Sequence, residues 1–472
     1  MIFSKIEFLF IFLPLFLIAH NFFPYRNCIY VLFSLFFYFV GEAWYAGIVV
    51  FSALMNYIFS LMIASSTKQF HRRLILSYSI FLNIAILFFF KYSKFIVNDV
   101  FEINGVEFLD HIYLPLGISF FTFHSISYLV DVYRGDAKAD HSFVNILLYL
   151  LMFPQLIAGP ILRFHTVSNQ FKRRVVTARH LYFGLSLFCF GLGQKVLLAD
   201  TLAEVVNPLF VRADALTSFE AWIATLSYTL QIYFDFSGYS NMAIGLGWIT
   251  GFYFPKNFNF PYISKSITEF WRRWHMSLSR WFRDYLYIPL GGNRFGAFRT
   301  YLNLIVVFLL CGLWHGASWT FIAWGAYHGF FLVLERIGFA RQLDKIPFFL
   351  QRCYALLVVA VGWVLFRSDN ISQAGNLLHT MFFGWGDGQA EHIAQLITPE
   401  QALAFCLAVF FSSPFLIAIL DRRLPLPIVG QWRKDATGLE YGLGGLMALI
   451  VFCAASAKII LGAYSPFIYF RF

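Results

Sequence analysis

The chain has 472 residues, of which 59% are hydrophobic and only 13% are charged, whereas soluble domains carry about 25% charged residues. This composition excludes an ordinary soluble enzyme and predicts an integral membrane protein. The formal net charge of +10 does not indicate a nucleic-acid-binding protein, because the basic residues collect in loops between apolar segments, as membrane orientation requires. The six cysteines lie singly without a CxxC pair, so neither a disulfide framework nor a metal site is indicated.

Apolar runs predict the membrane-spanning helices, since a helix needs about 20 apolar residues to cross a bilayer. We expect an all-α polytopic membrane protein with one domain over residues 1–472, because the sequence has no internal repeat and no linker. The expected spans, about twelve in all, are residues 6–22, 28–41, 44–63, 74–96, 112–130, 180–200, 222–240, 301–318, 320–337, 351–366, 402–420 and 440–461.

Loop charges predict the orientation. Basic loops at 64–73, 163–179 and 421–437 indicate the cytoplasmic side, and the acidic loops 97–111 and 367–401 indicate the outside. Both termini then lie outside.

This topology requires that residues 142–162 do not cross the bilayer, and Pro154, Gly159 and Pro160 interrupt a helix there. Residues 241–300 are too polar to span, so we expect re-entrant and interfacial helices on the cytoplasmic face.

Polar residues inside the apolar stretch QIYFDFSGYSNMAIG, residues 231–245, call for an explanation. Gln231 and Asp235 lie four residues apart on one helical face. An ionisable group at membrane depth usually faces a cavity or a partner. The pair is therefore either a hydrogen-bonding link between helices or part of a functional tunnel.

The stretch SITEFWRRWHMSLSRWFRDYLYIPLGGN, residues 266–293, combines aromatic and basic residues. Ser266 and Glu269 have capping-box spacing, so a helix should begin there. The pattern predicts an amphipathic helix in the membrane interface that binds lipid headgroups or admits an anionic cytosolic donor. The apolar stripe is Trp271, Trp274, Leu278, Trp281 and Phe282; the basic residues are Arg272, Arg273, Arg280 and Arg283, with His275 between them.

Two histidines, His315 and His328, occur in CGLWHGASWTFIAWGAYHG, residues 311–329. The small residues of this stretch let helices approach closely and form a protein-lined site. Burial disfavours the charged imidazolium, and a neutral imidazole can accept a proton. His315, next to Trp314, is therefore either a general base or a hydrogen-bonded core residue, whereas His328 is more simply a structural core residue.

The chain ends in SPFIYFRF, where Pro466 stops helix continuation. The tail is expected outside the membrane. Its aromatic residues can serve as an interfacial anchor, or the Tyr469 phenol can carry an acyl group with the help of a base such as His315.

Six stretches, distributed along most of the chain, resemble the sequence motifs of one family. They are LPLGISFFTFHSISYLVDVYRGD (114–136), FPQLIAGPILRF (153–164), QIYFDFSGYSNMAIGLG (231–247), NFNFPYISKSITEFWRRWHMSLSRWFRDYLYIPLGGNR (257–294), GLWHGASWTFIAWGAYHG (312–329) and the closing SPFIYF. The chain resembles the membrane-bound O-acyltransferase (MBOAT) family, in its bacterial branch that acetylates exopolysaccharides such as alginate.

The resemblance implies an O-acyltransferase of the bacterial cytoplasmic membrane. His315 corresponds to the family's catalytic histidine and His275 to its second signature histidine, near the cytoplasmic mouth of a tunnel. Arg272, Arg273, Asp235 and Trp314 become candidates for donor binding or for the tunnel wall. Acetyl-CoA is the implied donor, no metal or tightly bound cofactor is implied, and the implied partners are periplasmic acetyltransferase proteins and a polysaccharide acceptor.

Other functions remain open at this stage. Peptidoglycan O-acetyltransferases and teichoic-acid D-alanylation subunits share the implied fold and histidines. A transporter would predict inverted repeats and polar residues in many spans, whereas here the polar residues concentrate in residues 231–329. A non-catalytic scaffold for a periplasmic enzyme would tolerate loss of His315.

Overall fold

The regular structure is helical, as the composition predicts. The computed structural model describes residues 2–103, 105–384, 397–415, 437–462 and 467, and no β-strand occurs within these ranges. The residues form two compact units, one of residues 1–188 with 240–255 and one of residues 189–239 with 256–472. The all-α prediction is confirmed, and the prediction of a single domain stays a prediction.

Six helical segments among the described residues are long and apolar enough to cross a bilayer. They are Arg26–Ser65, Gln69–Lys91, Ala178–Val211, Gly296–His315, Phe348–Arg367 and Gly438–Ile460. Shorter apolar helical segments occupy Phe8–Phe22 and Pro399–Phe411. The number of about twelve crossings and the side on which each loop lies therefore stay predictions.

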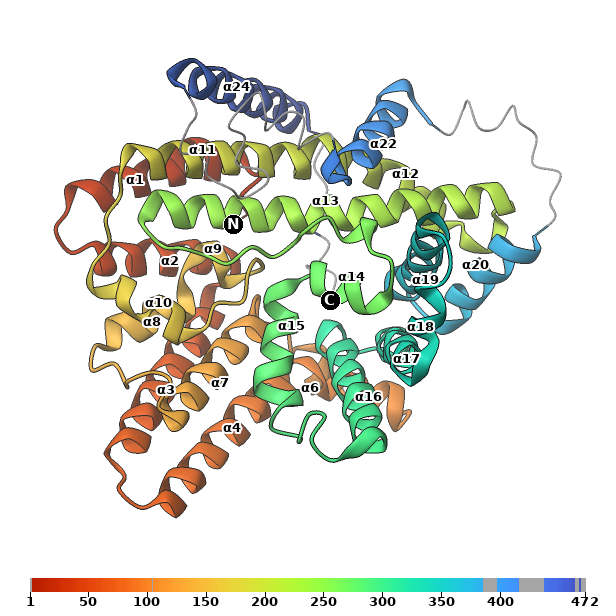
Figure 1. Ribbon diagram of the computed structural model, residues 1–472. Helices are drawn as coiled ribbons and strands as arrows, with labels where there is room; N and C mark the ends of the chain where they lie inside the picture. The colour runs from red at the N-terminus through yellow and green to blue at the C-terminus, as the bar shows by residue number, and fades with distance from the viewer. Residues whose placement is uncertain (1, 104, 385–396, 416–436, 463–466, 468–472) are drawn as a thin grey trace. The chain divides into compact units, whose positions relative to one another are not determined.

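The first unit is built around α7, which packs against both α3 and α4 (Figure 1). The buried amides of Asn56 on α3 and Asn83 on α4 bond each other at 3.1 and 2.8 Å, which satisfies two polar groups in apolar surroundings. The unit's helices are α1 (Leu13–Phe22), α2 (Arg26–Glu42), α3 (Ala46–Ser65), α4 (Gln69–Lys91), α5 (Ser93–Phe95), α6 (Glu107–Asp110), α7 (Ile118–Arg134), α8 (Phe143–Leu151), α9 (Phe153–Leu156) and α10 (Phe164–Lys172).

The predicted interruption within residues 142–162 is confirmed. Helix α8 ends before Met152, α9 lasts four residues, and no helix forms from Ile157 to Arg163. Buried polar groups replace the missing helical bonds: the Gln155 amide donates to the Tyr149 carbonyl at 2.7 Å. Irregular backbone of this kind is tolerated at membrane depth where protein surrounds it.

The second unit contains the stretches singled out for chemistry. Its helices are the π-turn η4 (Gln194–Ala199), α12 (Asp200–Val211), α14 (Ile267–Arg273), α15 (Met276–Phe282), α16 (Gly296–His315), α17 (Trp319–Leu334), the π-turn η8 (Glu335–Phe339), α18 (Ala340–Leu343), α19 (Phe348–Arg367), α20 (Ile371–Phe383), α22 (Pro399–Phe411) and α24 (Gly438–Ile460). Two long helices, α11 (Ala178–Gly193) and α13 (Ser218–Thr250), contribute residues to both units.

The close approach of two helices predicted for residues 311–329 is confirmed by α16 and α17, which pack side by side (Figure 1). A Cβ on Gly312 would lie 2.1 Å from the Phe321 carbonyl oxygen, and one on Gly325 would lie 2.3 Å from that of Phe308. Only glycine fits at either position.

The prediction of one amphipathic interfacial helix from Ser266 onward is wrong. The segment forms two short helices, α14 and α15, which are separated at Trp274 and His275. The predicted apolar stripe is buried inside the protein instead of facing lipid; its members are Trp271, Trp274, Leu278, Trp281 and Phe282. Ser266 does cap α14, accepting the Glu269 N–H at 3.0 Å. The expected outer loop 367–401 also contains a helix, α20.

Candidate active site

His275 lies at the break between α14 and α15 and is fully buried. Its Nδ1 lies 3.2 Å from the Asn257 Oδ1. Because that oxygen can only accept, Nδ1 carries the proton and Nε2 keeps its lone pair. Nε2 is buried and has no hydrogen-bond partner among the described residues. The geometry therefore presents Nε2 as a proton acceptor.

The backbone around His275 is fixed by the segment that carries Asn257. His275 has φ of 40°, a left-handed conformation that non-glycine residues rarely adopt. The Met276 N–H donates to the Asn257 carbonyl at 2.8 Å, and the Asn259 N–H donates to the Arg273 carbonyl at 2.9 Å. The Asn257 side chain also accepts the Ser277 N–H and hydroxyl, at 3.2 and 2.8 Å. These bonds hold the unusual turn in place.

The charge state of His275 follows from its surroundings. Burial lowers the pKa of His275 to about 3, because the imidazolium would lose its hydration. Its ring meets the Phe236 ring edge-on, with 4.6 Å between centroids. The imidazole is therefore neutral over the physiological pH range.

His315 is the last residue of α16 and is 3% exposed. Its ring is enclosed by Trp314, Trp324 and Phe366, with centroid distances of 4.8, 5.1 and 5.2 Å. The Trp314 ring also contacts His275, at 6.3 Å between centroids. The structure thus brings the predicted His275, Trp314 and His315 together in one aromatic cluster.

His328 occupies a different position in the same unit. It is fully buried, and its Nδ1 accepts a hydrogen bond from the Trp271 indole N–H at 3.4 Å. A Cβ on Gly362 would lie 2.8 Å from the His328 Nε2, so α19 packs tightly over the ring. These contacts agree with a structural core residue.

Asp235, predicted as a tunnel or linking residue, forms a buried ion pair. Its Oδ1 lies 2.7 Å from the Lys195 Nζ, which also lies 2.5 Å from the Asp200 Oδ1. All three side chains are no more than 4% exposed. Lys195 and Asp200 were not predicted, although charged residues inside the apolar segment 180–200 and at its end are a recognisable signal.

Phe467, the one described residue of the C-terminal stretch, is buried within the second unit. That ring is fully buried and stacks on Tyr239 with 4.7 Å between centroids. It also lies 6.3 Å from the Phe236 ring, which contacts His275. Tyr469 lies outside the described residues, so its proposed role as an acyl relay stays a prediction.

The two arginines predicted to bind the donor differ in their contacts. Arg273 pairs with Glu269, with 2.8 Å from both Nε and Nη2 to one carboxylate oxygen, and donates to the Asn259 carbonyl at 3.0 Å. Arg272 is exposed, and its guanidinium has no hydrogen bond or ion pair among the described residues. Of these two arginines, Arg272 is therefore the one whose guanidinium is available for a ligand.

A pocket of about 520 Å³ lies beside Arg272. Arg336, which sequence reasoning missed, lines it with an exposed side chain. The lining also includes aromatic and apolar side chains, among them Trp271, Phe308 and Cys311. A lining that combines cationic and apolar side chains suits an amphiphilic anion, because Arg binds phosphate in a bidentate manner.

Glu335, another residue that sequence reasoning missed, positions the arginine-bearing helix. Its two carboxylate oxygens accept the Ile267 and Thr268 N–H groups of α14, at 2.6 and 2.9 Å. The Tyr354 hydroxyl donates to the same carboxylate at 3.2 Å. This buried side chain is distant from α14 in sequence, so no local pattern could reveal it.

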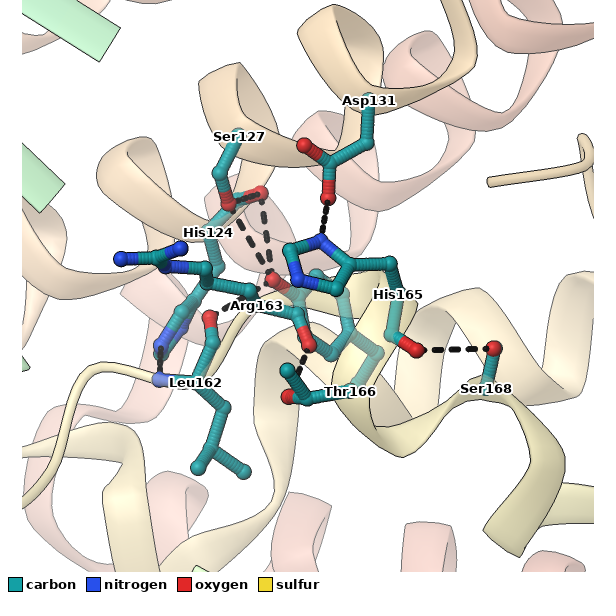
Figure 2. Close-up of polar contacts among 9 residues, drawn as sticks. His124, Ser127, Asp131, Leu162, Arg163, His165, Thr166 and Ser168 are labelled. Atoms are coloured by element: carbon teal, nitrogen blue, oxygen red, sulfur yellow. Dashed lines mark hydrogen bonds and ion pairs between the residues drawn. The ribbon is translucent and has the colours of Figure 1, made fainter. Parts of the chain in front are cut away.

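The first unit contains a separate cluster of histidines (Figure 2). The buried His124 Nε2 accepts the Leu162 N–H at 3.2 Å. His165, which is 32% exposed, pairs through Nδ1 with the buried Asp131 carboxylate at 2.8 Å. Neither histidine was predicted as a site residue.

The apolar helices indicate a multi-pass membrane protein. Within it, buried imidazoles and a cationic pocket lie in the same unit. Residues 35–368 match the model of the membrane-bound O-acyltransferase family, MBOAT, so the chain belongs to that family and is an acyltransferase. The predicted family resemblance is confirmed.

Full-length relatives add detail. The chain is 42% identical over 499 residues to the protein named "Probable alginate O-acetylase AlgI" from Pseudomonas putida, and 40% identical over 510 residues to its namesake from Azotobacter vinelandii; each comparison covers 100% of both chains. It is 38% identical over 384 residues to the "Peptidoglycan O-acetyltransferase" of Helicobacter pylori, covering 74% of this chain and 72% of that relative.

Proposed function

We propose that this acyltransferase takes acetyl groups from acetyl-CoA on the cytoplasmic side and delivers them across the bacterial inner membrane for O-acetylation of an extracytoplasmic polysaccharide, alginate. The observation that carries the proposal is the cluster of His275, Trp314 and His315 in the same unit as the arginine-lined pocket. The relatives named as alginate O-acetylases, similar over their whole length, support the choice of polymer.

The reaction is an acyl transfer and requires a base. An acceptor hydroxyl attacks the thioester carbonyl, the C–O bond forms, the C–S bond breaks, and the hydroxyl proton must be removed. His315 is the proposed base for that proton, as its place in the family motif implies. His275, whose Nε2 keeps a lone pair and whose ring also contacts Trp314, is a second candidate. General-base help of this kind is typically worth about 10²–10⁴-fold in rate.

The pocket lined by Arg272 and Arg336 is the proposed entry for the donor. Acetyl-CoA combines phosphates with a long, weakly polar arm. The two guanidiniums would pair with the phosphates, and the apolar lining residues would contact the arm. No tightly bound cofactor is needed for this reaction, since acetyl-CoA is consumed as a substrate.

A second acceptor deserves a test because of one observation, the similarity to a peptidoglycan O-acetyltransferase over 74% of this chain. Both acceptors lie outside the membrane, so we expect periplasmic acetyltransferase proteins as partners in either case. Neighbouring genes would separate the two: alginate biosynthesis genes favour alginate, and cell-wall acetylation genes favour peptidoglycan.

The deciding experiment is His315→Ala in the producing strain, with polymer O-acetyl content and membrane abundance measured together. We expect O-acetylation to be lost while the protein remains in the membrane. Normal acetylation by this variant would support a scaffold or transporter instead. Tyr469→Phe, which removes only the hydroxyl, tests the relay: an unchanged acetyl content would assign the tail to anchoring.

A further inference from the structure

The first unit contains a basic pocket that the proposed reaction does not use. Its volume is about 480 Å³, and its charged lining residues are Arg26, Lys172, Arg173 and Arg174. None of the residues that line it is an Asp or a Glu. Pockets of about 300–1,000 Å³ are of the size that takes small ligands, so this one can hold an anionic group such as a lipid headgroup.

Two helix starts and one helix end form the wall of this pocket. Helix α2 begins at Arg26 and α8 begins after the Ser142 cap, and these two helices pack against each other (Figure 1). The Asn27 amide donates to the Asn145 Oδ1 and to the Phe171 carbonyl, both at 2.9 Å. A single side chain thus joins α2, α8 and the end of α10, so the pocket is preformed.

The start of α2 adds partial positive charge to the pocket. The N–H groups of Asn27 and Cys28, in the first turn, have no hydrogen-bond partner among the described residues. Such groups at a helix start attract anions. The start of α8 contributes less, because the nearby Asp140 carboxylate accepts the Ser142 N–H at 2.8 Å and the Asn145 amide at 3.0 Å.

Two arginines of the pocket repel each other. The partly buried Arg174 guanidinium lies 4.3 Å from the centre of the Phe252 ring and donates to the Gln170 carbonyl at 3.4 Å. Burial, with repulsion from Arg26 as a smaller cause, lowers the pKa of Arg174 to about 10, so the group keeps its charge at pH 7. The Arg26 side chain has no hydrogen bond or ion pair among the described residues. An anion between the two would offset both the repulsion and the lost hydration.

Exposed aromatic residues indicate that the pocket lies where lipid is available. Phe22, Phe23 and Tyr25, at the junction of α1 and α2, are all exposed, and Tyr25 also lines the pocket. Aromatic residues of this kind favour the edge of the bilayer. The loop 163–179, which supplies three of the four basic residues, is predicted on the cytoplasmic side, where anionic lipids attract basic segments.

We propose that this pocket binds the headgroup of an anionic phospholipid. The phosphate lies between the Arg26 and Arg174 guanidiniums and the free N–H groups of α2, and Lys172 and Arg173 add attraction at longer range. The acyl chains follow the exposed aromatic residues at the junction of α1 and α2. The bound lipid links α2, α8 and α10, and the site does not depend on which acyl group or acceptor the enzyme uses.

The test uses the purified full chain in a mild detergent, titrated with phosphatidylglycerol while native mass spectrometry counts the lipids retained. We expect one tightly retained molecule. Phosphatidylcholine with the same acyl chains should bind at least about fivefold more weakly, because its choline cation cancels the net negative charge. Glycerol phosphate, which lacks the acyl chains, should not displace the lipid at equal concentration.

Matched variants locate the lipid. Arg26→Gln with Arg173→Gln removes two charges and leaves the partly buried Arg174 in place. The dissociation constant for phosphatidylglycerol should rise about 25-fold, at about fivefold for each arginine. Lys68→Gln with Arg73→Gln removes the same number of charges from another basic loop of the unit, and should change the constant by less than about twofold.

A charge-preserving variant separates lost attraction from a folding defect. Arg26→Lys with Arg173→Lys should retain most of the binding, and weakening equal to that of the Gln pair would overturn the electrostatic site. Equal weakening by the Gln pair and its control would also overturn it. Displacement of the lipid by glycerol phosphate would assign the pocket to a soluble phosphate compound, and displacement by acetyl-CoA would assign it to the donor; either result overturns the lipid site.

Discussion

Two fully buried histidines, one in each unit, illustrate that burial alone does not make a base. His124 in the first unit uses Nε2 to accept the Leu162 backbone N–H (Figure 2). His275 in the second unit donates from Nδ1 to Asn257 and keeps the lone pair on Nε2. The first imidazole secures a non-helical segment, and the second is prepared to accept a proton.

The two units also contrast in their basic pockets. A pocket of about 480 Å³ in the first unit is lined by Arg26, Lys172, Arg173 and Arg174. The pocket beside Arg272 in the second unit has aromatic residues in its lining and belongs to the unit that holds His275. Positive charge is common to both pockets, so the neighbouring groups must decide which one admits the donor.

The largest expected effect tests the contrast between the histidines. His275→Asn keeps a donor toward Asn257 and suits the left-handed backbone, because Asn tolerates that conformation, but it removes the Nε2 base. We expect acetyl transfer to fall by about 10²-fold or more. The measurement is the initial rate of label incorporation into polymer in membranes with matched protein amounts.

His124→Gln is the matched control, since its side-chain oxygen can still accept the Leu162 N–H. We expect the rate of acetyl transfer to stay within about threefold of wild type. The variant preserves the hydrogen bond, whereas a buried N–H left without an acceptor would cost about 1–3 kcal/mol of stability. Equal losses from both variants would mean that the two histidines share a structural role.

The second prediction compares the basic pockets. Arg272→Ala should raise the Michaelis constant for acetyl-CoA by about 10- to 100-fold, since a charge-assisted hydrogen bond contributes about 1.5–3 kcal/mol. Arg173→Ala in the first unit should leave that constant within about twofold. The constants come from initial rates at varied acetyl-CoA concentration, and a larger effect from Arg173 would place the donor in the first unit's pocket.

The third prediction concerns carboxylates that bind backbone in each unit. Glu335→Gln replaces one acceptor oxygen with an amide donor facing the α14 N–H groups, and should destabilise the protein by about 1–3 kcal/mol. Glu42→Gln in the first unit should have a smaller effect, because Glu42 accepts a single backbone N–H, from Leu116 at 3.2 Å. Thermal unfolding in detergent measures both, and the reverse order would contradict the contacts described.

The last prediction is a pH dependence of stability. Because the folded-state pKa of His275 is lowered to about 3, the unfolded chain binds more protons than the folded chain below about pH 6.5. Stability should therefore fall as the pH drops, by about 2 kcal/mol at most between pH 7 and pH 5 for this residue. Unfolding temperatures across that range should fall less steeply in His275→Asn, and parallel curves would argue against a buried neutral imidazole.

The sequence determined the membrane class, the helical architecture, the break within residues 142–162 and the close pairing of α16 with α17. These features follow from composition, proline and glycine placement, and helical spacing, all of which act locally. Local patterns also indicated His275 and His315, and the stretches that contain them supported the family resemblance.

Tertiary structure decided what those residues can do. The stripe from Trp271 to Phe282 fits one helix by spacing, but the turn at His275, held by Asn257, divides it and buries both halves. Glu335 meets α14, and Lys195 meets Asp235, from distant parts of the chain. Periodicity reports which face of an element is apolar; the atom that faces a given lone pair or charge is set by packing between elements, because contacts between remote residues leave no local pattern.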